Sequence, residues 1–133
     1  MKIEHIAIWV KDIDKVCEFY RKYFGGVVHP IYHNPTKQFT SQFVTFDDGA
    51  RLEIMHRPDI DVGTEGLFHV EQSEHLGYAH LSFSVGSKEE VNRLTKQMYA
   101  DGIQVVGEPR TTGDGYYESV VLDPEGNRVE ITV

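Results

Sequence analysis

Four side chains have the types and the spacing expected of ligands to a divalent metal: His5, Glu53, His80 and Glu130. Imidazole nitrogen and carboxylate oxygen suit zinc, nickel, iron, cobalt and manganese as divalent ions. Each of the four stands among apolar neighbours, where a carboxylate is costly unless it is paired or bound to a cation. Four protein ligands on a six-coordinate ion leave two positions for water or for oxygens of a substrate.

A repeat within the chain makes these four residues more informative together than apart. His80 lies 75 positions after His5, and Glu130 lies 77 positions after Glu53. Taken singly, a strand histidine is more often packed or hydrogen-bonded, and a strand glutamate is more often solvated. Because the repeat places the four residues at equivalent positions in its two copies, binding of a shared metal is favoured over simple packing or solvation.

Each copy opens with a strand and continues into a helix. Residues 2–10 and 77–85 alternate between apolar and polar side chains, as half-buried strands do. Asp12 and Ser87 are suitable N-caps for the helices that follow, and each helix runs up to a glycine. The two histidines are therefore predicted to lie on the first strand of each copy.

Each copy also ends in a hairpin, over residues 43–55 and 119–132. Both hairpins have an Asp-containing turn with glycine. In the first copy, alternation along the last strand places Leu52 and Ile54 on one face and Glu53 on the other. We therefore expect two βαβββ units and a fold of the α+β class.

This organisation predicts a single domain, with module one at 1–56, a linker at 57–76 and module two at 77–133. Its 133 residues are enough to bury an apolar core. The lone Cys17 cannot form an internal disulfide, and no signal-peptide-like run precedes the first charges, so a cytoplasmic protein is expected. No segment is long and apolar enough to span a membrane. A net charge of -8 with scattered cations argues against nucleic acid as a partner.

The motifs resemble the vicinal oxygen chelate superfamily along nearly the whole chain: IEHIAIWVKD, EFYRKYFGG, GYAHLSFSV and LDPEGNRVEI. This superfamily includes glyoxalase I, methylmalonyl-CoA epimerase, fosfomycin-resistance proteins, extradiol dioxygenases and bleomycin-resistance proteins. The resemblance implies eight strands curled into an open cup around the metal, commonly with dimerisation. It also puts the four residues named first on the family's ligand positions, as the set seen in glyoxalase I. Zinc or nickel is then expected, with cobalt, manganese or iron as alternatives.

The chemistry of such a site follows from its charges. A divalent ion that binds two adjacent oxygens stabilises an enediolate, so a proton leaves the carbon next to a carbonyl more easily. Glu130 is the candidate base, with Glu53 as its counterpart in the other copy. The expected function is a metal-dependent lyase or isomerase of the glyoxalase I type, acting on a small molecule.

Two positions depart from the glyoxalase I enzymes of this length. Trp9 stands where they usually carry an arginine that holds a glutathione carboxylate, and Arg57 stands where they tend to carry an asparagine. Trp9 is interpreted as stacking on a substrate or packing in the core, and Arg57 as binding a substrate anion or forming a surface ion pair. Tyr116 and Tyr117, near the expected mouth of the cup, are candidates to hydrogen-bond the substrate. These departures argue against glutathione.

Other functions stay open beside this one. One is another enzyme of the superfamily: an epimerase, an extradiol dioxygenase or a fosfomycin-type transferase. The last two use two histidines and one glutamate, so a carboxylate at Glu53 argues against both. Another is a non-catalytic module that binds a metal or a small molecule, although bleomycin-binding members lack these ligands. A homodimer is expected, with each site built from one chain or from modules of two chains.

Overall fold

The computed structural model describes residues 3–60, 79–113 and 115–133, and the chain divides into two compact units, Met1–Leu67 and Phe68–Val133. The predicted linker at 57–76 lies outside the described residues from position 61 onward, and so do the first two residues of the strand predicted at 77–85. Each unit is described by itself below.

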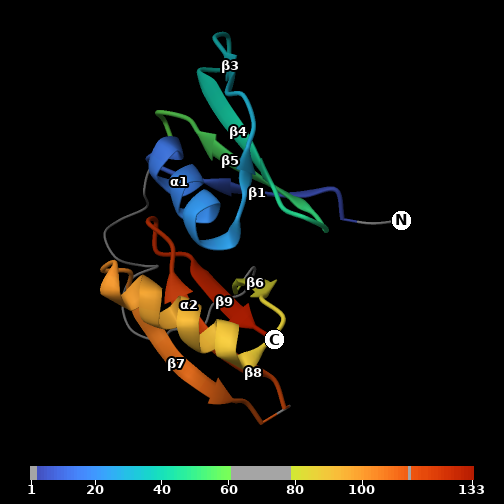
Figure 1. Cartoon of the computed structure of the whole chain (residues 1–133). Helices are drawn as coiled ribbons and strands as arrows, with labels where there is room; N and C mark the ends of the chain where they lie inside the picture. The colour runs from blue at the N-terminus through green and yellow to red at the C-terminus, as the bar shows by residue number, and fades with distance from the viewer. Residues whose placement is uncertain (1–2, 61–78, 114) are drawn as a thin grey trace. The chain divides into compact units, whose positions relative to one another are not determined.

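The first unit is a sheet covered on one face by a helix. Its elements in chain order are β1 (His5–Trp9), α1 (Ile13–Phe24), β2 (Val27–Val28), β3 (Tyr32–Asn34), β4 (Phe39–Thr45) and β5 (Arg51–His56). The strand order is β1-β5-β4-β2, with β3 also paired to β4. The first and last strands, β1 and β5, run parallel, whereas β4 is antiparallel to its neighbours. Figure 1 shows α1 lying against this sheet.

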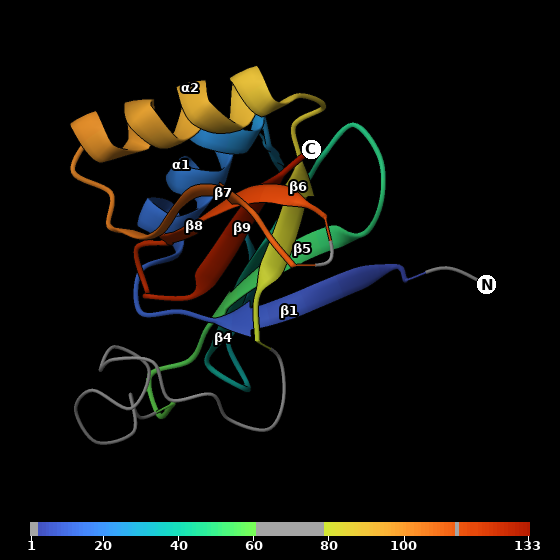
Figure 2. The ribbon, with the colours of Figure 1, turned by 90° about the horizontal axis from the view of Figure 1, so that it is seen from below.

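The second unit repeats the same arrangement. Its elements are β6 (Leu81–Ser84), α2 (Lys88–Ala100), β7 (Val105–Thr111), β8 (Tyr117–Leu122) and β9 (Arg128–Thr132). The order β6-β9-β8-β7 again pairs the first strand in parallel with the last. Figure 2 shows α2 crossing one face of this sheet. The predicted sequence of strand, helix and three strands is confirmed in both units, and so is the α+β class.

One strand was not predicted from the sequence. In the first unit Tyr32–Asn34 pairs with Phe39–Ser41 as an extra short strand, β3. The tight turn between them contains Gln38, whose φ of 50° is unusual for a residue other than glycine. Three residues with a His and an Asn carry too little apolar alternation to be recognised as a strand.

Helix boundaries follow local capping chemistry, as predicted. Asp12 accepts a hydrogen bond from the Lys15 backbone N–H at the start of α1. Ser87 does the same for Glu90 at the start of α2. Helix α1 ends at Gly25, whose φ of 66° lies in the left-handed region where a side chain would be strained. Neither described helix is long and apolar enough to cross a membrane.

The core repeats along with the elements. Three pairs of equivalent positions are fully buried between helix and sheet in the two units: Val16 and Val91, Val44 and Val121, Ile54 and Ile131. Burying a side chain of this size contributes about 1.5 to 3 kcal/mol, so these positions hold each helix on its sheet. Cys17, on the buried face of α1, is also part of this core, and burial raises the pKa of its thiol to about 11.

Candidate metal centre

The helix of each unit covers one face of its sheet, and the histidine and glutamate of that unit lie on the other face. Along β1, Ile6 and Ile8 are less exposed than His5, Ala7 and Trp9, which alternate with them. Ala7 is the register partner of Glu53 on β5, so Glu53 shares the face of His5. Because side chains alternate between the two faces of a strand, His5 and Glu53 lie together on one face of the sheet while the other face packs against the core.

The second unit brings its own pair together in the same way. His80 directly precedes β6, and Glu130 on β9 is the register partner of Ser82, two residues along from His80. Ile131, the neighbour of Glu130, is fully buried on the helix side. Position 82 is also the counterpart of Ala7 in the repeat, so both glutamates are placed by equivalent backbone contacts.

The two pairs have similar geometry. His5 Nε2 lies 3.8 Å from Glu53 Oε2, and His80 Nε2 lies 3.2 Å from Glu130 Oε2. The carboxylate side chains are 16% and 18% exposed, and the imidazoles are 42% and 43% exposed. Each carboxylate is therefore mostly withdrawn from water, while each imidazole is open on one side.

These distances fit ligands of one metal ion. Two ligands bonded at about 2.1 Å to the same ion lie roughly 3.0 to 3.4 Å apart. The His80–Glu130 separation falls in that range, and the His5–Glu53 separation is only slightly wider. An imidazole and a carboxylate are also ligands that suit a divalent transition metal. Within the described part of the chain no group of three or more such side chains gathers, so each unit supplies one pair.

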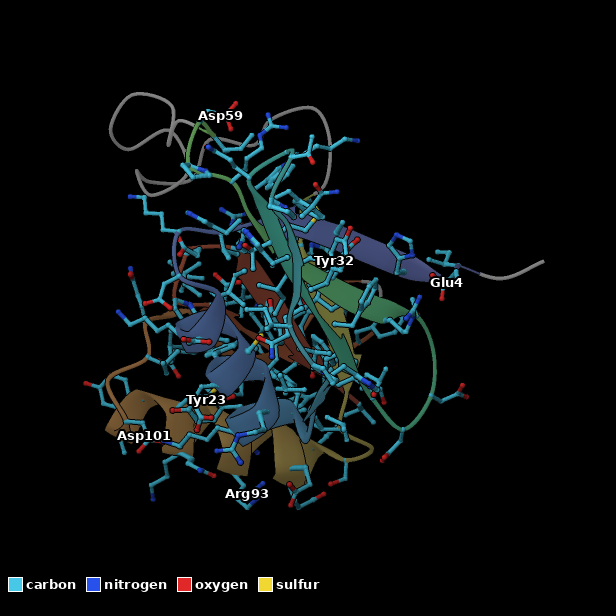
Figure 3. All side chains as sticks on the ribbon, turned by 90° about the horizontal axis from the view of Figure 1, so that it is seen from above. Glu4, Tyr23, Tyr32, Asp59, Arg93 and Asp101 are labelled. Atoms are coloured by element: carbon cyan, nitrogen blue, oxygen red, sulfur yellow. The ribbon has the colours of Figure 1, made fainter. Side chains whose placement is uncertain are left out.

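The histidine of the first unit has a partner on its other ring nitrogen. His5 Nδ1 makes a short hydrogen bond to the carboxylate of Glu4, and the guanidinium of Arg51 pairs with the same carboxylate. The hydrogen bond with His5 leads the contacts that hold the pKa of Glu4 below its usual value, and Arg51 adds to it. A protonated Nδ1 leaves Nε2 with its lone pair toward Glu53. Figure 3 labels Glu4 at the start of β1.

An aromatic ring, that of Phe43, contacts both His5 and Arg51. The Phe43 ring meets the His5 ring edge to face at 5.7 Å, and the Arg51 guanidinium lies 4.0 Å from the centre of the Phe43 ring. Glu4, Arg51 and Phe43 were not predicted as site residues from the sequence. An acid directly before the histidine was the one signal available, because the other two contacts depend on strand register.

The second unit has an equivalent of only one part of this support: Arg128 is the counterpart of Arg51 in the repeat. Ala79 stands directly before His80, where the first unit has Glu4 before His5, and Val120 is the register partner of Glu130, where the first unit has Phe43 beside Glu53. At these two positions the His80–Glu130 pair has smaller side chains than the His5–Glu53 pair.

The four residues predicted to contact substrate lie in different settings. Trp9 is on the face of His5 and is 42% exposed, and Arg57 lies over its ring. Tyr116 is exposed just before β8. Tyr117 faces the helix side of its sheet, where its hydroxyl donates to Asn92 Oδ1 at 2.8 Å. The structure therefore brings Trp9 and Arg57 together and engages Tyr117 with α2.

Comparison with known proteins identifies the family. A family model described as the Glyoxalase/Bleomycin resistance protein/Dioxygenase superfamily matches residues 2–131. The chain belongs to this superfamily. The match confirms the family resemblance inferred from the motifs, and it includes all four candidate ligands.

Individual relatives are distant but extend along the chain. The lactoylglutathione lyase of Haemophilus influenzae is 24% identical, over 98% of this chain and 90% of that protein. The crystal structure of SMU.1112c aligns with a TM-score of 0.78 and 26% identity, covering 100% of this chain and 98% of that one. Glyoxalase I from Zea mays aligns with a TM-score of 0.76 at 20% identity, covering 98% of this chain but 44% of that one. The fold is therefore the glyoxalase fold.

Proposed function

We propose that this protein is a metal-dependent lyase or isomerase of the glyoxalase I type, acting on a small molecule with two adjacent oxygens. The observation that carries the proposal is the pair of equivalent His–Glu contacts, one in each unit. Superfamily members commonly bind a divalent metal, and one characterised relative is a lactoylglutathione lyase. His5, Glu53, His80 and Glu130 would together hold one ion, zinc or nickel in preference to cobalt, manganese or iron.

The chemistry divides between the ion and the carboxylates. When bound, the ion would stabilise negative charge on two adjacent substrate oxygens. Glu130 takes the proton from the carbon next to the carbonyl, so that the C–H electron pair forms a carbon–carbon double bond and the carbonyl pair moves onto its oxygen. Glu130 then returns the proton to the former carbonyl carbon, while the proton of the hydroxyl on the first carbon passes to the other oxygen, so the carbonyl and hydroxyl groups exchange places. Glu53, its counterpart in the first unit, is the second candidate base. The limited exposure of both carboxylates keeps water from competing for that proton.

Two other functions remain as alternatives. Another enzyme of the superfamily would use the same pairs for epimerisation, oxygen chemistry or group transfer. A non-catalytic module would keep the metal and the small molecule without turnover. Glutathione is not favoured as the thiol, because Trp9 is an exposed ring in contact with Arg57 rather than a cation. We still predict that Tyr116 and Tyr117 contact the substrate. We also predict a homodimer, in which each metal site is built from one chain or from two.

Metal analysis of four variants tests the proposal. Wild-type protein, reconstituted with nickel, zinc, cobalt and manganese in turn, should bind one ion per four-ligand site. His5→Ala and His80→Ala should each weaken binding by more than about 100-fold, because loss of even an outer partner costs about 10- to 100-fold. Glu130→Gln should in addition lower turnover by about 100- to 10,000-fold, the usual contribution of a general base. Glu89→Gln, exposed on α2, is the matched control and should leave metal content unchanged.

The substrate panel separates the alternatives. It should contain hemithioacetals, 2-methylmalonyl thioesters, catechols and fosfomycin with a thiol. Isomerisation of the first class supports the proposal, and turnover of another class supports the second enzyme type. Metal binding without any turnover supports the non-catalytic module. Wild-type protein that takes up no stoichiometric metal under any of these conditions would overturn the proposed site.

A further inference from the structure

Two exposed aromatic rings, those of Trp9 and Tyr32, form a row on the first unit with the half-buried ring of Phe39. The Phe39 ring meets the Trp9 ring edge to face at 6.0 Å and the Tyr32 ring at 6.2 Å. Tyr32 is 54% exposed and Trp9 is 42% exposed, although rings of this size are mostly buried in soluble proteins. Figure 3 labels Tyr32 on this unit. We call Tyr32, Phe39 and Trp9 the aromatic row.

A cationic hollow adjoins one end of the row. The Arg57 guanidinium lies 5.5 Å from the centre of the Trp9 ring, and Arg57 also lines a hollow of about 490 Å³ with Thr36, Lys37, Gln38 and Asp59. Asp59 accepts a hydrogen bond from Arg57 Nε at 2.6 Å. That hydrogen bond orients the guanidinium. Within the described residues, the two terminal nitrogens of Arg57 donate no hydrogen bond.

The combination of rings and cations has a specific chemical complement. An exposed apolar strip bordered by charge marks a binding surface more often than an ordinary surface. Aromatic rings attract a planar aromatic group, and the two terminal guanidinium nitrogens match the two oxygens of a carboxylate. Lys37 adds a second positive charge, so two cations and one carboxylate, that of Asp59, line the hollow.

We propose that the aromatic row and Arg57 form a binding subsite for an aromatic carboxylate, with the ring of the ligand on Trp9 and its carboxylate on Arg57. This subsite lies on the same sheet face as His5, and Ala7 between His5 and Trp9 adds little bulk. Four residues of strand span about 13 Å, so one elongated molecule can reach both places. Its assignment as the remote part of a substrate rests on the proposed function, whereas binding of the aromatic carboxylate does not.

The test uses the single tryptophan of the chain as its reporter. In a ¹H–¹⁵N correlation spectrum the indole Nε1–H signal belongs to Trp9 alone. Titration with naphthalene-2-carboxylate should move this signal in a saturable manner. Naphthalene-2-methanol lacks the carboxylate and cyclohexanecarboxylate lacks the aromatic ring, and each should bind at least about 10-fold more weakly, as loss of a charged hydrogen bond or of ring stacking predicts.

Three variants distinguish binding at this subsite from nonspecific attraction of the ligand to positive charge. Arg57→Gln removes the charge and the paired donors, and should weaken naphthalene-2-carboxylate by about 10-fold or more. Lys22→Gln is the matched control, because Lys22 also lies over an aromatic ring, that of Tyr23, at 4.9 Å. It should leave the affinity unchanged. Trp9→Leu, followed by calorimetry, should abolish measurable binding while circular dichroism shows the fold retained.

The outcomes keep this inference separate from the metal proposal. The titration is run on metal-stripped and metal-loaded protein, and a saturable shift in both supports the subsite. Absence of a shift in protein that still binds metal overturns the subsite and leaves the metal site standing. Equal weakening by Arg57→Gln and Lys22→Gln also overturns it. If Trp9→Leu instead halves the mass seen by light scattering, the row is covered by a second copy of the chain and the inference is wrong.

Discussion

The two units share a scaffold and a ligand pair but differ in what surrounds the pair. Val16, Val44 and Ile54 in the first unit have buried equivalents in the second, and each unit holds a histidine within 4 Å of a glutamate. Around His5 lie Glu4, Arg51 and the ring of Phe43, together with the aromatic row farther along the same face. In the second unit the positions that correspond to Glu4, Phe43 and Trp9 hold Ala79, Val120 and Ser84, whereas Arg128 corresponds to Arg51.

This difference separates two kinds of constraint. Core positions cannot change independently, because a cavity or a clash in either unit costs several kcal/mol. Residues on the open face lack that constraint, so the first unit can carry an acid and aromatic rings at positions where the second carries small side chains. The first unit therefore offers the richer set of contacts for a ligand, and the second offers a plain His–Glu pair.

The largest expected effect tests the shared part of the comparison. Ile54→Ala and Ile131→Ala each remove a fully buried side chain at an equivalent position, and each should lower the free energy of unfolding by about 2 to 5 kcal/mol. Urea unfolding followed by circular dichroism measures this change. Val27→Ala, at an exposed residue of β2, should stay within about 0.5 kcal/mol of wild type. A cost below 1 kcal/mol at either isoleucine would contradict an equivalent core.

The next effect tests the support around His5. Glu4→Ala should weaken metal binding by about 10- to 100-fold, because the carboxylate fixes the orientation and tautomer of the imidazole. Glu4→Gln, whose amide oxygen still accepts from Nδ1, should restore part of the affinity. Cobalt(II) titration with a competing chelator measures the affinity, and the cobalt absorption band reports whether the coordination geometry changes.

The reverse substitution sharpens the same comparison. Ala79→Glu introduces at His80 the acid that His5 already has, and should leave metal binding unchanged or raise it. Glu89→Ala, at an exposed residue of α2, serves as the control for loss of a carboxylate. If Glu4→Ala binds cobalt as tightly as wild type, the contact with Glu4 is a surface hydrogen bond without influence on the metal.

The smallest effect concerns a polar contact that the second unit buries. Thr95 Oγ1 donates to the Val91 carbonyl and lies 2.6 Å from Ser119 Oγ, so the Ser119 hydroxyl donates to Thr95. The first unit has the buried ring of Tyr20 at the position equivalent to Thr95. Thr95→Val should cost about 1 to 2 kcal/mol, because it leaves the buried Ser119 hydroxyl without an acceptor.

A double-mutant cycle checks this contact. Thr95→Val with Ser119→Ala should cost less than the sum of the two single changes, since no polar group is then left unpaired. Urea unfolding gives each value, and Thr36→Val on the surface controls for loss of a hydroxyl. Strict additivity of the two changes would show that the hydroxyls do not act as a pair.

Local sequence was sufficient for most of the fold. Asp12 and Ser87 predicted where the helices begin because capping depends on neighbours three residues away. Alternation around Leu52 and Ile54 predicted which side of β5 is core, and the structure confirms it. The strand β3 escaped prediction, because its pairing with β4 rests on a turn around Gln38 and not on its own alternation.

The sequence by itself determined the repeat, the superfamily and the four residues proposed as ligands, because types and spacings are preserved when a unit is duplicated. Only the tertiary structure decided which side chains meet. Glu4 and Arg51 join at His5, and Phe39 brings Trp9 into a row with Tyr32, because strand register and rotamers set such contacts over long separations. The spacing of residues in the sequence does not predict these contacts, because they form only when the strands pair in the sheet.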